Sequence, residues 1–362
     1  MHYFKRLSRC ACLAVLVSTS AYIPYATAQV RPSQPATLEF RFDYELAKIV
    51  SNAVVAGELD DKTATAVRAL PATAAMVRKM KLKDTDEFLA YLRTLVKNPK
   101  VADAARLVAS ELSRTTGGKY ETLGTDVTRQ LREYVPPQFA ARMTVHFIFG
   151  GYSGGFAFDD DPNNVYVNLA YLAQGSTQEL SEIVAHELFH AVQAHEMSKP
   201  PRPAAGAGAA AAGHVWLNRL LYDLIQEGTA QLFIHPVASR PATSAYSTGA
   251  RNRIERNTKR IEGIATLFET IGFRLLLAPP HDETAYDRIY GLMFYTGFDE
   301  QAYYLGWVMA TAIEQKEGKA AIFALLKDSP KRFILRYQTL AQADQKLPKF
   351  SDEFIRAVST LP

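Results

Sequence analysis

The chain contains very little cysteine, and its two cysteines lie close together near one end. Only Cys10 and Cys12 are present among 362 residues, and both fall in an N-terminal segment that we expect to be removed. The mature chain would then have no disulfide bond and no thiolate ligand. Histidine, aspartate and glutamate remain as the side chains able to bind a metal ion.

The sequence also lacks a long apolar run and a marked excess of charge of one sign. The apolar stretch at residues 11–22 is shorter than the roughly 18 residues that a membrane span needs, and no later stretch qualifies. The formal net charge is +4, and without Lys5, Arg6 and Arg9 it falls to +1, from 38 basic (41 less these three) and 37 acidic residues. We therefore expect no stable membrane insertion and no nucleic-acid partner.

Residues 1–28 have the pattern of a cleavable bacterial signal peptide. A basic start and the apolar stretch are followed by Ala26-Thr27-Ala28, a small-x-small cleavage signal, so Gln29 would be the first mature residue. The pattern predicts a periplasmic or secreted bacterial protein. The alternative is an uncleaved N-terminal anchor.

The rest of the chain reads as a globular α+β protein that is mostly helical. Its 48% hydrophobic and 22% charged residues are typical of a sizeable core. Apolar residues recur at helical spacing from Leu38 to Val135, so residues 29–135 are expected to form a helical region. After Pro136-Pro137, alternation at residues 143–149 and a run at residues 165–169 predict two strands within a second region, 136–362. His146 in the first strand is expected to be structural.

Two histidines lie four residues apart, with a glutamate directly after the first: His186, Glu187 and His190. Positions i and i+4 share one face of a helix, so both imidazoles can reach a single ion, with Glu187 beside them. This is the H-E-x-x-H pattern of zinc hydrolases. Ser176 and Glu179 form a capping box that predicts the helix start. The helix is apolar nearly all round and should be buried, where such polar groups are costly unless paired or bound to metal.

The third ligand must come from elsewhere. Ten residues after His186 stands Glu196, and Gln193 occupies the place of the glycine bend that would bring a third histidine back to the metal. Glu227 is the preferred candidate, because it lies on a separate apolar helix that follows a Pro/Ala/Gly-rich insertion at 199–213, expected to be a loop. Glu227 could instead be a helix cap or half of a buried ion pair. His195, His214 and His235 remain alternative third ligands, and Asp223 could accept a hydrogen bond from a histidine N–H.

Three motifs together carry a family resemblance. The patterns His186-Glu187-x-x-His190, Glu227-Gly228-x-Ala230 and residues 303–307 (Tyr-Tyr-Leu-Gly-Trp) resemble the gluzincin clan of zinc metallopeptidases, most of all its poorly characterised bacterial families. The similarity covers roughly residues 145–337. One departure is Gln231, which stands where thermolysin-like members have an aspartate.

The resemblance implies a zincin-like core with a small mixed sheet beside the H-E-x-x-H helix, and peptide or protein substrates. It implies that His186, His190 and Glu227 hold Zn²⁺, which would acidify a water molecule and polarise the scissile carbonyl. Glu187 would act as general base, and Tyr303, or failing it Tyr304, would stabilise the oxyanion.

Other interpretations remain. One is a non-catalytic metal-binding or scaffold protein of the same fold, against which the intact Glu187 argues. Others are a different hydrolase, or a chance motif in a helical binding protein. The basic run at residues 251–260 is expected to be a solvated helix face, with a site for an anionic partner as the alternative.

Overall fold

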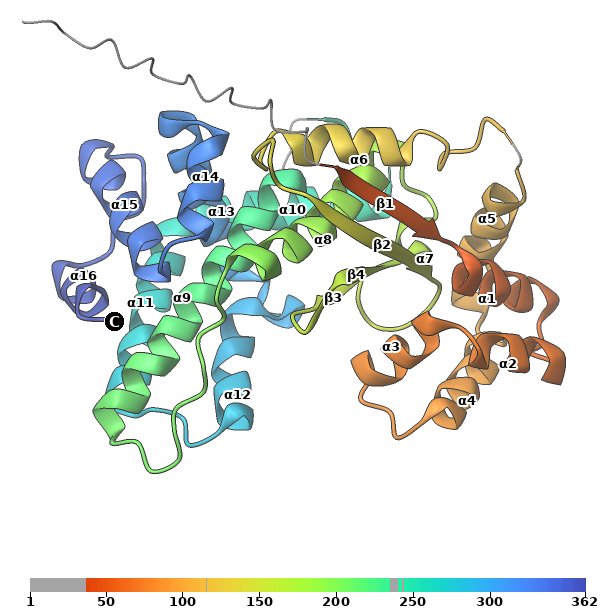
Figure 1. Cartoon of the computed structure of the whole chain (residues 1–362), viewed down its shortest axis with the longest axis horizontal. Helices are drawn as coiled ribbons and strands as arrows, with labels where there is room; N and C mark the ends of the chain where they lie inside the picture. The colour runs from red at the N-terminus through yellow and green to blue at the C-terminus, as the bar shows by residue number, and fades with distance from the viewer. Residues whose placement is uncertain (1–36, 115, 235–239, 243) are drawn as a thin grey trace, which may run out of the picture. The chain divides into compact units, whose positions relative to one another are not determined.

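Helices around one four-stranded mixed sheet make up the protein (Figure 1). The computed structural model describes residues 37–114, 116–234, 240–242 and 244–362. The chain from Pro35 to Pro362 forms one compact unit. The predicted α+β, mostly helical fold is confirmed.

The sheet has the strand order β1-β2-β4-β3. Its strands are β1 (Leu38–Asp43), β2 (Ala141–Ile148), β3 (Gly155–Phe158) and β4 (Asp161–Asn168). β2 is parallel to both β1 and β4, whereas β3 is antiparallel to β4 and lies at the edge. Residues 145–148 of β2 are all buried, because both faces of this strand are covered. The two predicted strands correspond to β2 and β4.

The expectation of helix from Leu38 onward is wrong at its start, where β1 lies. Leu38, Phe40 and Phe42 alternate with charged residues, which is the period-2 pattern of a strand. Because β1 pairs with β2, the predicted regions 29–135 and 136–362 share one sheet. The division between them stays a prediction.

The remainder of the N-terminal region is helical, as predicted. The helices are α1 (Glu45–Ala56), α2 (Asp61–Arg68), α3 (Pro71–Lys79), α4 (Thr85–Leu95), α5 (Ala102–Ser113) and α6 (Leu123–Arg132), with a 3₁₀ turn at Pro99–Val101. Local signals set their ends: Asp60 and Asp84 cap the starts of α2 and α4, and Gly57 ends α1 in the left-handed conformation.

Three helices follow β4: α7 (Leu169–Leu172), α8 (Thr177–Glu196) and α9 (Ala209–Ile234). The capping box of Ser176 and Glu179 starts α8, as predicted. The loop expected through residue 213 is wrong in its second half. Helix α9 begins at Ala209, because alanine has the highest helix propensity and the run continues into an apolar helix.

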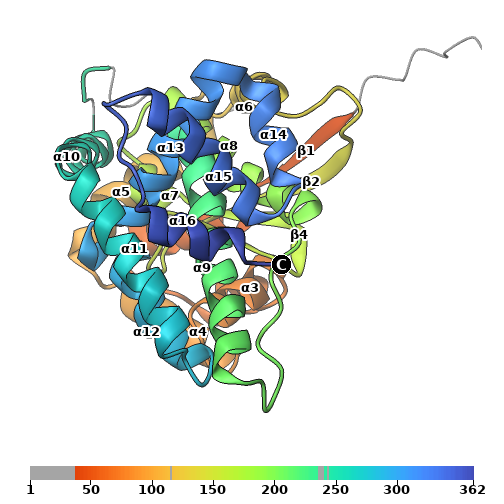
Figure 2. The ribbon, with the colours of Figure 1, turned by 90° about the vertical axis from the view of Figure 1, so that its left-hand side faces the viewer.

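The C-terminal part contains only helices among its described residues. They are α10 (Ala245–Lys259), α11 (Ile261–Leu277), α12 (Glu283–Phe294), α13 (Gln301–Glu317), α14 (Lys319–Leu326), α15 (Pro330–Ala343) and α16 (Asp352–Ser359), with a 3₁₀ turn at Thr296–Phe298. Figure 2 shows α11, α15 and α16 near α9, and α9 packs against α8, α11, α13 and α15. Of the helices described, none combines the length and apolar character of a membrane span.

Candidate metal centre

His186 and His190 project from one face of the buried middle of α8. Their Nε2 atoms face each other at 3.1 Å, and their rings are nearly perpendicular, with centroids 4.7 Å apart. The helix around them is apolar, with Val184, Ala185 and Phe189 fully buried. The four-residue spacing therefore brings two imidazole nitrogens to one point on a largely buried helix.

Glu227 reaches the same point from α9. Its Oε2 atom lies 3.4 Å from His190 Nε2, and one donor atom from each of His186, His190 and Glu227 falls within 4.8 Å of the others. The structure thus brings the three predicted ligands together. Two imidazoles and a carboxylate match the donor set of catalytic zinc sites, and the convergence of both Nε2 atoms with an oxygen fits such an ion.

A glycine pair determines how closely the helix that carries Glu227 can approach its neighbour. A Cβ atom at Gly228 of α9 would lie 2.3 Å from Gly306 Cα of α13, and one at Gly306 would lie 2.4 Å from the carbonyl oxygen of Leu224. Only hydrogen fits in this crossing. The contact places the start of α13, including Tyr303, next to Glu227.

Gln193 orients His190, and the sequence reasoning did not assign it this role. Its Oε1 atom lies 2.7 Å from His190 Nδ1, while its Nε2 donates to Gln226 O and Thr229 Oγ1, both at 2.7 Å. In the neutral imidazole, Nδ1–H donating to Gln193 would leave Nε2 of His190 as the atom able to bind a metal ion. The sequence signal that could have identified this contact is a glutamine three residues after His190 on a buried helix.

Burial and nearby charges shift the pKa values of His186, His190 and Glu227. Burial, and then the charge of His190, lowers the pKa of His186 to about 3, so this imidazole is neutral. Burial alone would lower the pKa of His190, but Glu227 raises it to about 9. Burial opposes ionisation of Glu227, yet the charge of His190 and hydrogen bonds hold its pKa below its usual range. The buried Nδ1 atom of His186 has no hydrogen-bond partner among the described residues.

Glu187 lies beside the two histidines, against the edge strand β3. It is 7% exposed, and burial raises its pKa to about 7. A Cβ atom at Gly155 would lie 2.3 Å from Glu187 Oε1, so the carboxylate occupies the space where another residue would have its side chain. The backbone of β3 therefore forms one wall of the pocket around Glu187.

The two adjacent tyrosines of α13 face different neighbours. Tyr303 is hydrogen-bonded to Glu227, and burial raises its pKa well above the usual value. Tyr304 instead interacts with Arg253 of α10. The geometry therefore separates the two candidates, and Tyr303 is the one beside the three converging ligand atoms.

The alternative ligands lie elsewhere. His146 bonds Asp43 and Asn164 at 2.9 and 3.0 Å, the structural role that was expected. His195 lies 3.2 Å from Asn163 Oδ1, and Glu196 pairs with Lys327 at 3.0 Å. Neither they nor His214, from the first turns of α9, belong to the cluster that could hold a metal ion. His235 lies outside the described residues.

Among the described residues Asp223 pairs with no histidine, although its position one turn before Glu227 suggests such a contact. It accepts hydrogen bonds from Arg219 Nε at 3.0 Å and from Tyr286 OH at 2.7 Å. Burial raises its pKa to about 6. Its contacts tie α9 to α12, so it supports the fold around the site.

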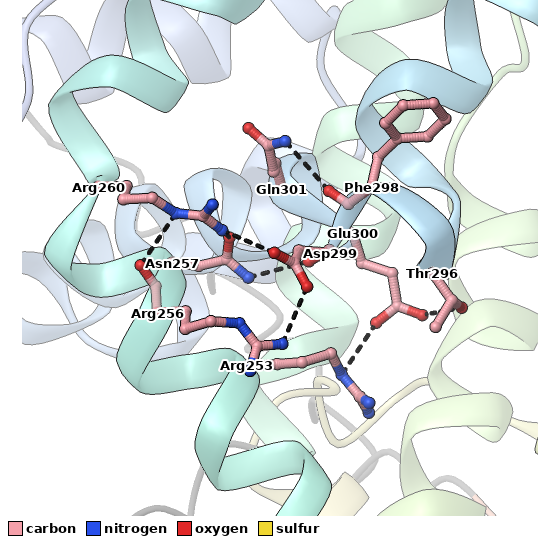
Figure 3. Close-up of polar contacts among 9 residues, drawn as sticks. All are labelled: Arg253, Arg256, Asn257, Arg260, Thr296, Phe298, Asp299, Glu300 and Gln301. Carbon is pink, nitrogen blue, oxygen red and sulfur yellow. Dashed lines mark hydrogen bonds and ion pairs between the residues drawn. The ribbon is translucent and has the colours of Figure 1, made fainter.

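The basic run of α10 is exposed at Arg256, Lys259 and Arg260, as expected of a solvated face, and its arginines also pair with the turn before α13. Arg256 and Arg260 each pair with Asp299 at 2.9 Å, and Arg253 lies 3.5 Å from Glu300 (Figure 3). Asp299 and Glu300 both have positive φ, 64° and 53°, which is uncommon for residues other than glycine. The run therefore stabilises a strained turn that starts α13, three residues before Tyr303.

Two cavities have Glu187 and His186 in their linings. The smaller, of about 340 Å³, is lined by the three ligand candidates, by β3 and by Tyr290, Phe294 and Tyr303. The larger, of about 1180 Å³, is lined by residues of α7, α10 and the N-terminal helices. Tyr295, after α12, also lines both cavities, as does Lys79 of α3.

Comparison with known proteins gives one finding. A family model with the description "Putative zinc dependent peptidase (DUF5700)" matches residues 72–346, about three quarters of the chain. Neither the curated proteins nor the solved structures provide a match. The matched segment contains α8, α9 and α13, the helices that bear the cluster.

Proposed function

The chain belongs to the DUF5700 family, and from this premise we propose that it is a zinc metallopeptidase of the gluzincin type. The observation that carries the proposal is the convergence of His186, His190 and Glu227, whose donor atoms lie within 4.8 Å of one another. In gluzincin-type sites the third ligand is a glutamate on a helix separate from the H-E-x-x-H helix. Helices α8 and α9 have that relation.

The three ligand side chains would hold the ion, with Gln193 fixing the ring of His190. Zinc, when bound, supplies Lewis-acid polarisation of the scissile carbonyl and lowers the pKa of a water molecule to about 7. Glu187 takes a proton from the attacking water and passes it to the leaving amine. Its raised pKa suits a group that must both accept and donate a proton near neutral pH.

Tyr303 is proposed to donate a hydrogen bond to the oxyanion that forms from the carbonyl. Its hydroxyl is protonated at neutral pH, because burial and Glu227 raise its pKa, and it lines both cavities beside the ligands. Tyr304, directed towards Arg253, is not placed for this role. Tyr303→Phe should lower kcat about tenfold or more with little change in zinc content, and an unchanged kcat would remove Tyr303 from the reaction.

The edge strand β3 is proposed to bind the substrate backbone. One side of β3 pairs with β4, so its other side offers backbone N–H and C=O groups that an extended peptide can pair with. Gly155 at its start contacts Glu187, so a peptide added to this strand would pass the general base.

Activity on peptides tests the proposal. Zinc-loaded wild type should hydrolyse members of a peptide library, and Glu187→Gln should keep zinc and lose about 10²-fold or more of kcat. A non-catalytic metal-binding protein of the same fold is the second candidate. It predicts zinc binding in both proteins and hydrolysis in neither.

A further inference from the structure

Lys79 brings a positive charge from the N-terminal helical region into the catalytic cleft. It is the last residue of α3, and it lines both cavities together with His186 and Glu187. Residues 38–135 carry no sequence motif with a chemical role. Lys79 nevertheless places one side chain of this region in the site.

Contacts on either side of Lys79 hold α3 against the strand next to Glu187. Arg78 pairs with Asp160 at 2.8 Å, and its guanidinium lies 3.9 Å from the centre of the Phe158 ring. A Cβ atom at Gly151 would lie 2.9 Å from Met76 Cε, so the loop before β3 also touches this helix. The Lys79 ammonium itself lies 4.9 Å from the centre of the Phe156 ring. These contacts fix where the charge is presented.

In the described part of the chain the Lys79 ammonium forms no ion pair or hydrogen bond, and its contact is with the face of Phe156. The charges of Glu187 and Glu227 act on it from a greater distance. The side chain is exposed to solvent in the cleft. Partial desolvation by the surrounding protein lowers its pKa, and the charges of Glu187 and Glu227 oppose that effect. Among the residues that line the smaller cavity, Lys79 is the sole lysine or arginine. An anion bound in the cleft would complete its interactions.

We propose that Lys79 binds a carboxylate of the peptide substrate, close to the bond that is cleaved. The inference rests on the proposed peptidase function and names the substrate class of that same site. Phe156, over which the ammonium lies, directly follows Gly155, which contacts Glu187. Lys79 and the general base Glu187 line the same cavity, so a carboxylate bound by Lys79 would lie near the scissile bond.

Two parts of a peptide can supply such a carboxylate. One is the C-terminus of a substrate cleaved one or two residues from its end, which would make the enzyme an exopeptidase. The other is an aspartate or glutamate side chain beside the scissile bond. Both present the same oxygens to the ammonium, and a pair of substrate comparisons separates them.

The experiment uses a cleaved library peptide in two matched pairs. The first pair ends in a free acid or an amide, and the second has Glu or Gln next to the scissile bond. We expect zinc-loaded wild type to prefer the carboxylate in one pair by roughly 10- to 100-fold in kcat/KM, mainly through KM. Lys79→Met should reduce that ratio to near 1, and Lys79→Arg should retain most of it.

Lys83→Met is the matched control, because it removes the same charge four residues away, from an exposed side chain that lines neither cavity. It should leave the ratio as in wild type. The proposal is overturned if wild type shows no preference in either pair, or if Lys79→Met keeps the preference. An equal loss on all four peptides would also overturn it, since that would indicate a role on Glu187 or the oxyanion.

A binding measurement separates failure of this proposal from failure of the proposed function. Calorimetric titration of the same peptides into Glu187→Gln, with and without Lys79→Met, reports the carboxylate preference without turnover. Peptide binding with the expected preference but no hydrolysis by wild type would sustain the Lys79 site and contradict the peptidase. Hydrolysis without a preference that depends on Lys79 would support the peptidase and contradict the Lys79 site.

Discussion

At the scale of single residues, the position of Glu187 depends on a neighbour that has no side chain. The Glu187 carboxylate fills the space where a Cβ atom of Gly155 would lie. We predict that Gly155→Ala folds and keeps zinc, because the clashing group is the end of a flexible side chain. It should lose about 10- to 100-fold of kcat, since a small displacement of the general base is enough.

Gly154→Ala is the control for this variant, because a Cβ atom there would meet nothing within 4 Å. Steady-state kinetics of the two proteins, with zinc content measured in parallel, checks the prediction. Equal kcat values for Gly154→Ala and Gly155→Ala would show that contact with Gly155 does not position Glu187.

Asp223 gives a residue-scale prediction about stability. Its pKa rises from 3.8 to about 6 on burial in the folded chain. Between these values the folded state binds more protons than the unfolded state, so the contribution of Asp223 is fully present below about pH 4. This contribution, on the order of 2 to 3 kcal/mol of unfolding free energy, is lost as the pH rises through about 6.

Urea unfolding of wild type and Asp223→Asn at several pH values isolates this contribution. The unfolding free energy of wild type relative to that of Asp223→Asn should decrease as the pH rises from 4 to 7. A difference that is independent of pH would contradict the assigned pKa of Asp223.

The sequence was most informative for residues whose chemistry depends on local spacing. His186, Glu187 and His190 share one helix, so their arrangement follows from helix geometry, and the structure brings Glu227 to them as expected. Gly155 and Lys79 escaped notice because their importance arises from contacts between segments far apart in the chain. The role of Gln193 depends on its contacts with α9 as well as with His190.

At the scale of elements, the crossing of α9 and α13 joins a ligand to a proposed catalytic tyrosine. Gly228 directly follows Glu227, and Gly306 lies one turn after Tyr303. We predict that Gly228→Ala forces the helices apart and destabilises the protein by about 1 to 3 kcal/mol, with weaker zinc binding. Urea unfolding and a competitive zinc chelation assay measure the two effects.

Gly263 provides the comparison, since it lies in α11 and a Cβ atom there would meet nothing within 4 Å. Gly263→Ala should be neutral or stabilising by up to about 1 kcal/mol, because alanine is the better helix former. If both alanine variants behaved alike, the α9–α13 crossing would not need its glycines.

Elements with strong local signals were predictable, and those defined by pairing were not. The capping box located the start of α8, and the alternation at residues 143–149 located β2. The four-residue edge strand β3 is too short to show a period of its own, and it exists because it pairs with β4. Sheet order is likewise a property of the folded chain, since β1 joins β2 from about 100 residues away.

At the scale of the whole molecule, the sequence leads to a proposed place of action. Residues 1–28 lie outside the described residues, and we propose that they direct export to the periplasm or beyond. Expression of the full sequence in a bacterium should yield an exported protein that begins at Gln29, as measured by intact mass and N-terminal sequencing. An exported or membrane-bound chain that retains Met1 would favour the uncleaved anchor.

The family match and the geometry both support the proposal that His186, His190 and Glu227 together hold a zinc ion. Elemental mass spectrometry of the purified protein tests it most directly, with His190→Ala and Glu227→Ala prepared alongside. We predict about one zinc per wild-type chain and a large loss in both variants, provided circular dichroism shows them folded. A folded wild type without zinc, or folded variants that keep the full amount, would contradict the metal centre.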